Sequence, residues 1–214
     1  LRKDGYRQIM ELWQKFNLAR RPLFAPLHKA IETRNVAELY EYWVFFSLAE
    51  QIGDLLEIHP VFQLRSSDKM GLEWSSQTLF STCGKLIFNR TYYRNSQHFH
   101  TYSTTMRPDF TWVRNGSPKV IFDAKFSFGT IDKILEEGEL SEQYETIPSL
   151  GDLYKMHTYR DALRLDAAII IYPGNSSVFF ELDRGKRTDV GLSDCLSDEL
   201  HGIGAIPMQP GSNL

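Results

Sequence analysis

The Asn115-Gly116 pair constrains the fold of this chain more than any other feature of its sequence. It separates two segments rich in β-branched and aromatic residues, 109–114 and 119–126. Because Asn-Gly between strand-like segments is a strong signal for a two-residue hairpin, we expect the two segments to pair as antiparallel neighbours. Asp109 opens the first segment, and Asp123 and Lys125 lie near the end of the second. The hairpin is therefore predicted to bring Asp109 close to Asp123 and Lys125.

Helices and further strands are predicted on both sides of this hairpin. Asn35 and Glu38 have the spacing of a capping box, which begins a helix predicted to run to about residue 56. An amphipathic helix over about 150–165 precedes an apolar strand over 167–172. Other expected elements are strands at 61–64, 77–81, 85–93, 178–182 and 203–208, a helix at 6–20, a linker at 21–26 and an acidic, helical segment at 131–146. This order predicts an α/β fold with a central mixed β-sheet flanked by helices, preceded by an N-terminal helical extension.

The distribution of charge is more informative than the net charge of −3. Between Lys85 and Lys125 there are seven Lys or Arg residues against two Asp, whereas 130–166 holds nine acidic residues against four basic ones. A basic face beside an acidic one could bind phosphates, although each run could also be solvated surface. Charge alone therefore does not decide whether the partner is a nucleic acid.

The remaining composition points to a cytoplasmic protein that has no membrane segment. No apolar run approaches the roughly 20 residues that a membrane-spanning helix needs, and the N-terminus has no signal-peptide pattern. Cys83 and Cys195 lie far apart without a zinc or disulfide pattern, which favours a reducing compartment. Because the chain begins without Met, we expect it to be a fragment of a longer protein.

Asp109, Asp123 and Lys125 form the candidate catalytic group. Side chains alternate along a strand, so Asp123 and Lys125 point to one face while Ala124 points to the opposite layer. Two carboxylates on adjacent strands could hold Mg²⁺, with the backbone carbonyl of Ala124 as a further ligand. The metal would make a bound water acidic enough to attack a phosphodiester, and Lys125 would orient that water or neutralise developing charge. The alternative is a surface hairpin in which Asp109 caps a turn and Asp123 pairs with Lys125.

Glu41 is a further candidate because it is the only charged residue between Leu39 and Ala49, in a helix that is apolar almost all round. An ionised carboxylate in such surroundings needs a partner. Glu38 is already assigned to the cap, so Glu41 is interpreted as a third metal ligand or as a group that holds a metal-bound water. The alternative is a salt bridge to a buried arginine.

Lys155 and Tyr159 are four residues apart on the predicted 150–165 helix and therefore share one face. An ammonium and a phenol near a carboxylate cluster suit contacts to a DNA phosphate backbone. The alternative for Tyr159 is core packing with the other apolar residues of the helix. We therefore treat Lys155 as the stronger candidate for DNA binding.

Taken in order, these motifs resemble those of the PD-(D/E)xK nuclease superfamily. The resemblance rests on Pro108-Asp109, Asp123-Ala124-Lys125, the preceding helix with Glu41 and the following helix. More narrowly, residues 38–43 and 152–162 resemble the nuclease domain of McrC-like restriction proteins, in which the later helix usually carries Gln where this chain has Lys155. The resemblance implies a restriction-endonuclease-like core over 35–214, with 1–34 as the N-terminal extension.

The resemblance also implies an activity and partners. It predicts Mg²⁺-dependent hydrolysis of DNA, with Mn²⁺ as a substitute, by Glu41, Asp109, Asp123 and Lys125. The protein would act in restriction or anti-phage defence with an AAA+ GTPase or ATPase partner, and a homodimer would explain cleavage of both strands. One alternative is a nuclease-fold DNA-binding module that cleaves only with a motor partner or not at all. The other is a structural or interaction domain whose acidic residues lie at the surface.

Overall fold

A computed structural model of the chain describes residues 35–63, 77–80, 84–96, 100–126, 149–197 and 199–210. Within these residues one sheet of nine strands has the order β1-β2-β3-β4-β5-β6-β9-β7-β8. The strands are β1 (Val61–Gln63), β2 (Gln77–Phe80), β3 (Gly84–Phe88), β4 (Phe110–Arg114), β5 (Ser117–Ala124), β6 (Ala167–Tyr172), β7 (Val178–Glu181), β8 (Gly185–Arg187) and β9 (Gly202–Pro207), and the helices are α2 (Val36–Leu56), α3 (Leu150–Leu163) and α4 (Leu192–Leu196). The predicted extension 1–34, with its helix at 6–20 and linker at 21–26, and the acidic segment 131–146 lie outside the described residues.

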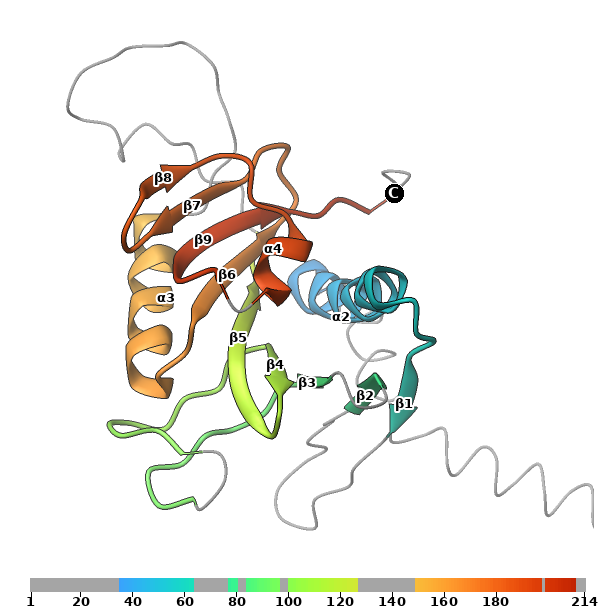
Figure 1. Ribbon diagram of the computed structural model, residues 1–214, viewed down its shortest axis with the longest axis horizontal. Coiled ribbons are helices and arrows are strands. Elements are labelled where there is room, and N and C mark those ends of the chain that lie inside the picture. Colours follow the sequence, from blue (N-terminus) through green and yellow to red (C-terminus); the bar gives the residue numbers. More distant parts are fainter. Residues whose placement is uncertain are drawn as a thin grey trace, which may run out of the picture.

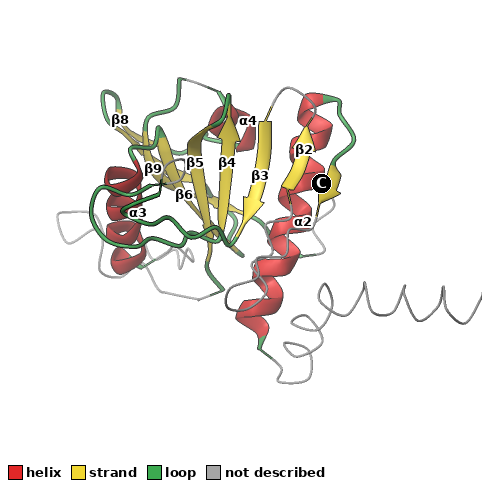
Figure 2. Cartoon of the chain, turned by 90° about the horizontal axis from the view of Figure 1, so that it is seen from below, coloured by secondary structure: helices red, strands yellow, loops and turns green. Residues whose placement is uncertain are grey.

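Helices cover both faces of the sheet (Figures 1 and 2). On one face, α2 and α4 pack against alternate strand residues such as Phe122 and Ile169. On the other face, α3 packs against the residues between them, such as Ile121 and Ile170. The alternation follows from the two-residue period of a strand, which places a continuous apolar segment in contact with two helical layers. This three-layer α/β arrangement confirms the predicted fold class.

The predicted hairpin is formed by β4 and β5, which pair antiparallel from Arg114 opposite Ser117 at the turn to Phe110 opposite Phe122. Asn115 and Gly116 have φ angles of 52° and 77°, the two positive values that a type I′ hairpin turn requires. From β5 the sheet continues in parallel through β6 to β9, with α3 in the connection between β5 and β6. Asp123 therefore lies at the carboxyl end of a central strand, where antiparallel and parallel parts of the sheet meet.

Several boundaries differ from the sequence predictions. β3 ends at Phe88 rather than at residue 93, because Asn89 adopts a left-handed conformation with φ of 53°. Tyr92 and Tyr93 then form only isolated bridges. At the start of α2 the Asn35 side chain caps the Glu38 N–H, but the Glu38 carboxylate accepts from the side-chain amide of Asn35 rather than from its backbone.

The sequence predicts no helix or strand in the polar segment between 182 and 203, yet this segment contains β8 and α4. Both elements are too short to produce a readable periodicity. Among the helices of the described residues, none is both long enough and apolar enough to cross a membrane.

Candidate active site

Asp109 is held across the open end of the hairpin by backbone contacts. Its Oδ2 accepts a hydrogen bond of 2.8 Å from the N–H of Ala124. Its own carbonyl accepts a bond of 2.6 Å from the N–H of Asn89, the residue that follows β3. Asp109 is therefore fastened to the strands on both sides of it, and its carboxylate is directed toward the end of β5.

Asp123 is the buried centre of the site, with none of its surface exposed. Its Oδ2 lies 2.5 Å from the Nζ of Lys125, and its Oδ1 and Oδ2 lie 3.0 and 3.3 Å from the Nζ of Lys155. One carboxylate is thus paired with two ammonium groups, which come from the end of β5 and from α3. An ionised carboxylate at such depth needs this compensation, because burial without it is costly.

The short strand segment 123–125 has the alternation predicted from the sequence. Ala124 packs into the layer of α2 and is 5% exposed, whereas Asp123 and Lys125 share the opposite side. The Lys125 N–H donates to the carbonyl of Ile171 over 2.8 Å, which extends the pairing of β5 with β6 by one residue. The Lys125 ammonium also lies 3.5 Å from the carbonyl of Ala124, the predicted backbone ligand for a metal.

The carboxylates interact electrostatically as a cluster. Burial raises the pKa of Asp109 to about 7, and the negative charges of Asp123 and Glu41 act in the same direction. The hydrogen bond from Ala124 and the charge of Lys125 oppose this rise. Burial first, and the neighbouring carboxylates second, therefore disfavour the ionised form of Asp109.

Glu41 reaches the same group from α2. Burial raises its pKa, Lys125 is the strongest charge that lowers it, and Asp123 raises it further. Within the described residues no ion pair joins Glu41 to an arginine, the alternative interpretation of this residue, although the charge of Arg107 also acts to lower the Glu41 pKa. Glu41 therefore adds its charge to the cluster of Asp109 and Asp123.

Lys155 and Tyr159 are positioned by α3, which begins at a capping box between Ser149 and Asp152. Burial lowers the pKa of Lys155, but its bonds to Asp123 and the charge of Asp109 outweigh this effect and raise it overall. The Lys155 ammonium lies 5.2 Å from the centre of the Tyr159 ring, within the range of a cation–π contact. Tyr159 is 6% exposed and its hydroxyl donates to the carbonyl of Arg107 over 3.0 Å. Lys155 therefore belongs to the carboxylate cluster, and Tyr159 connects α3 to the segment that leads to Asp109.

A family model described as the PD-(D/E)XK nuclease superfamily matches residues 38–177, which is more than half of the chain. The chain belongs to the PD-(D/E)XK nuclease superfamily. Comparisons with curated proteins and with solved structures give no match. The match confirms the superfamily predicted from the sequence and includes every predicted site residue, whereas the narrower likeness to McrC-like proteins stays a prediction.

The donor atoms of this nuclease-superfamily site suit a divalent cation. Magnesium prefers oxygen ligands, and Asp109, Asp123 and the Ala124 carbonyl supply them at a place where burial and neighbouring carboxylates disfavour the ionised form of Asp109. In the part of the chain that the structure describes, no group of three or more His, Cys, Asp or Glu residues could hold a metal. The set that fits is therefore two carboxylates with a backbone carbonyl, and direct ligation by Glu41 stays a prediction.

Sequence reasoning missed the ion pair between Lys155 and Asp123 and the backbone contacts of Asn89, Arg107 and Ile171. The ion pair had an indirect signal, because Asp123 follows an apolar strand and a lysine occurs on the next helix. The backbone contacts have no such signal, since any residue type can make them.

Substitution of Tyr159 by Phe tests its role as a link between α3 and the Asp109 segment. We expect the free energy of unfolding to fall by roughly 0.5–1.5 kcal/mol, because Phe lacks the hydroxyl that donates a buried hydrogen bond to the Arg107 carbonyl. Urea denaturation measures this change. The DNA affinity should change by less than about twofold, because this hydroxyl donates to the protein backbone and not to a DNA phosphate. A large loss of DNA affinity with no loss of stability would instead make Tyr159 a DNA contact.

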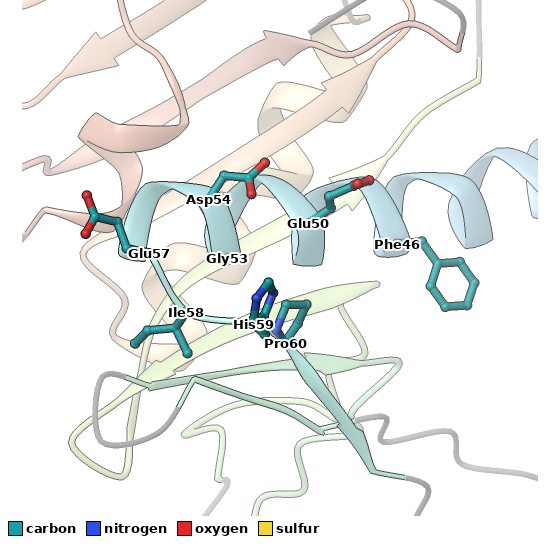
Figure 3. A pocket seen from close by; sticks show the side chains of 8 residues that line it. All are labelled: Phe46, Glu50, Gly53, Asp54, Glu57, Ile58, His59 and Pro60. Carbon is teal, nitrogen blue, oxygen red and sulfur yellow. The ribbon is translucent and has the colours of Figure 1, made fainter.

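A pocket of about 710 Å³ lies elsewhere, at the C-terminal end of α2 (Figure 3). Glu50, Asp54 and Glu57 line it from the helix, and His59 and Pro60 line it from the segment before β1. A second pocket of about 250 Å³ is lined by Trp43, Gln51 and residues at the ends of β6 and β9. Neither pocket is lined by Asp109, Asp123 or Lys125. The candidate active site is therefore the carboxylate cluster and not the larger of the two pockets.

Proposed function

We propose that this chain is a Mg²⁺-dependent deoxyribonuclease that cuts DNA internally and leaves 5′-phosphate and 3′-hydroxyl ends. The observation that carries the proposal is the fully buried Asp123, paired with Lys125 and Lys155 beside the Asp109 carboxylate. A structural ion pair would need only one of these lysines. Membership of the nuclease superfamily supports phosphodiester hydrolysis as the reaction.

Each side chain has a distinct part in the proposed reaction. Asp109, Asp123 and the Ala124 carbonyl would hold the cation, which when bound supplies positive charge to the scissile phosphate and acidity to a water. Lys125 orients the attacking water and offsets the negative charge that develops on the phosphate oxygens. Glu41 receives a hydrogen bond from that water, and Lys155 binds a phosphate of the DNA backbone.

We further propose that the chain is the nuclease part of a larger cytoplasmic restriction or anti-phage defence protein. The support is the likeness of residues 38–43 and 152–162 to McrC-like nuclease domains. An AAA+ GTPase or ATPase partner and a homodimer belong to the same proposal. A nuclease-fold module that cleaves only with its motor partner is the second candidate, because Lys155 replaces the usual Gln and occupies both Asp123 oxygens.

Incubation of the protein with supercoiled plasmid and Mg²⁺ or Mn²⁺ tests the proposal. The parent should convert supercoiled DNA to nicked and linear forms, a chelator should prevent this, and Asp123→Asn should remove it. Asp189→Asn is the matched control, since Asp189 is an exposed carboxylate paired with Arg187 away from the site. DNA binding without nicking supports the module, and the absence of both binding and nicking with a partner added rejects the proposal.

A further inference from the structure

Asp123 has more positive charge around it than a stable ion pair requires. Lys125 contacts Oδ2, while Lys155 bridges Oδ1 and Oδ2 at 3.0 and 3.3 Å. Together they neutralise a carboxylate that has no contact with solvent. The two ammonium groups therefore contact the same carboxylate oxygens that a divalent cation would need as ligands.

The two lysines differ in how easily they can leave. Lys125 is part of the sheet, because its N–H bonds to Ile171 on β6. The side chain of Lys155 comes from a different layer and is 41% exposed, against 26% for Lys125. When a divalent cation binds Asp123, electrostatic repulsion acts on both ammonium groups, and Lys155 is the one with the greater access to solvent.

Lys155 also has a second contact within the site, the ring of Tyr159. Its ammonium already lies 5.2 Å from the ring of Tyr159, and this ring is held in place by the hydrogen bond from its hydroxyl to Arg107. The hydrogen bond of Tyr159 thus fixes the face of α3 from which Lys155 extends, whereas the partly exposed Lys155 side chain can reorient. A released ammonium at the edge of the site would meet the phosphates of a bound DNA strand.

We propose that Lys155 is an exchangeable counter-ion, which pairs with Asp123 in the free protein and transfers to a DNA phosphate when a divalent cation binds. The inference rests on the proposed function of the site. It makes Lys155 a positioning residue that couples two binding events, so cation binding strengthens DNA binding and DNA binding strengthens cation binding by the same factor. If Lys155 were a permanent structural partner of Asp123, this coupling would not depend on it.

The coupling is measured with Ca²⁺ as the probe cation and a fluorescent DNA duplex. Isothermal titration calorimetry gives the Ca²⁺ affinity with and without DNA, and fluorescence anisotropy gives the DNA affinity with and without Ca²⁺. For the parent we expect each ligand to tighten the other by about tenfold, within the usual range of coupling between sites. For Lys155→Gln we expect Ca²⁺ to bind the DNA-free protein about tenfold more tightly and the coupling to fall at least about fivefold.

Lys119→Gln is the matched control, because Lys119 is 36% exposed and also pairs with an aspartate, Asp166, outside the site. It should retain the coupling of the parent. Lys155→Arg keeps the charge and should retain the coupling to within about twofold, which separates loss of charge from loss of fold. Parent-level coupling in Lys155→Gln, or no coupling in a parent that binds both ligands, overturns the inference while the proposed function stands. A parent that binds neither ligand contradicts both.

Discussion

Replacement of Lys125 by Gln is expected to reduce the rate of DNA cleavage by about 10²–10⁴-fold at saturating cation and DNA. The Lys125 ammonium lies 2.5 Å from Asp123 and 3.5 Å from the Ala124 carbonyl. It is therefore beside two of the groups proposed to hold the cation but is not itself a ligand. Its charge is available to the phosphate while the carboxylates are engaged. Gln keeps a polar side chain of similar length but has no charge. Single-turnover cleavage of a plasmid measures the change.

The Lys119→Gln variant again serves as the control for the loss of one lysine, since the Lys119–Asp166 pair has no contact with the carboxylate cluster. Its cleavage rate should be within about twofold of the parent. Thermal unfolding should show that Lys125→Gln remains folded, because Lys155 still compensates the buried Asp123. A Lys125→Gln protein that is folded and cleaves at the rate of the parent would remove Lys125 from the proposed reaction.

Asp109→Asn is expected to stabilise the cation-free protein at pH 8 while removing its cleavage activity. The pKa of Asp109 is about 7 in the folded chain, against about 3.9 in an unfolded one. Between these values the folded state binds more protons than the unfolded state, so the free energy of unfolding falls as the pH rises. Asn has no charge to bury, and we expect it to be more stable than Asp at pH 8 by about 1–4 kcal/mol.

Thermal unfolding in the presence of a chelator measures this effect at pH 5 and at pH 8. The difference between the parent and Asp109→Asn should be large at pH 8 and small at pH 5, where the Asp109 carboxyl is protonated in the folded protein. Asp189→Asn should instead be less stable than the parent by the same amount at pH 5 and at pH 8, because its hydrogen bond with Arg187 lowers the pKa of Asp189 and the carboxylate is ionised at both pH values. Addition of Mg²⁺ should stabilise the parent at pH 8 but not Asp109→Asn. If the difference in stability between the parent and Asp109→Asn were the same at both pH values, the pKa of Asp109 would not be raised in the folded protein and this prediction would be wrong.

The parts of the fold that the sequence predicted are those set by local chemistry. The 167–172 strand has the bounds of β6, because a continuous apolar segment lies between Asp166 and Pro173. The hairpin followed from the Asn-Gly turn, whose two positive φ angles few other dipeptides accept. Once these strands pair, the two-residue period of β5 sends Asp123 toward α3 and Ala124 toward α2.

The parts that could not be predicted depend on contacts between distant segments. Lys155 contacts Asp123 only because α3 crosses the sheet face beside the end of β5. The sequence between Asp123 and Lys155 does not indicate how the helix packs on the sheet. The same holds for the electrostatic interaction between Glu41 and Lys125, because Glu41 lies on α2, in the layer opposite to α3. β8 and α4 were missed because a strand or helix of so few residues shows no period.

The hairpin that holds the carboxylates at its open end leaves its closed end far from them. Five residues of β4 separate Asp109 from the turn, a length of roughly 17 Å at the rise of a β-strand. A side-chain carbon added at Gly116 would have no atom within 4 Å. The turn therefore lies in open space, but Gly116 itself must stay glycine because its φ of 77° strains other residues. The exposed Ser117 beside it is a suitable point to attach a fluorophore or a surface tether for single-molecule experiments, because a linker placed there leaves the carboxylate-bearing end of the same two strands uncovered.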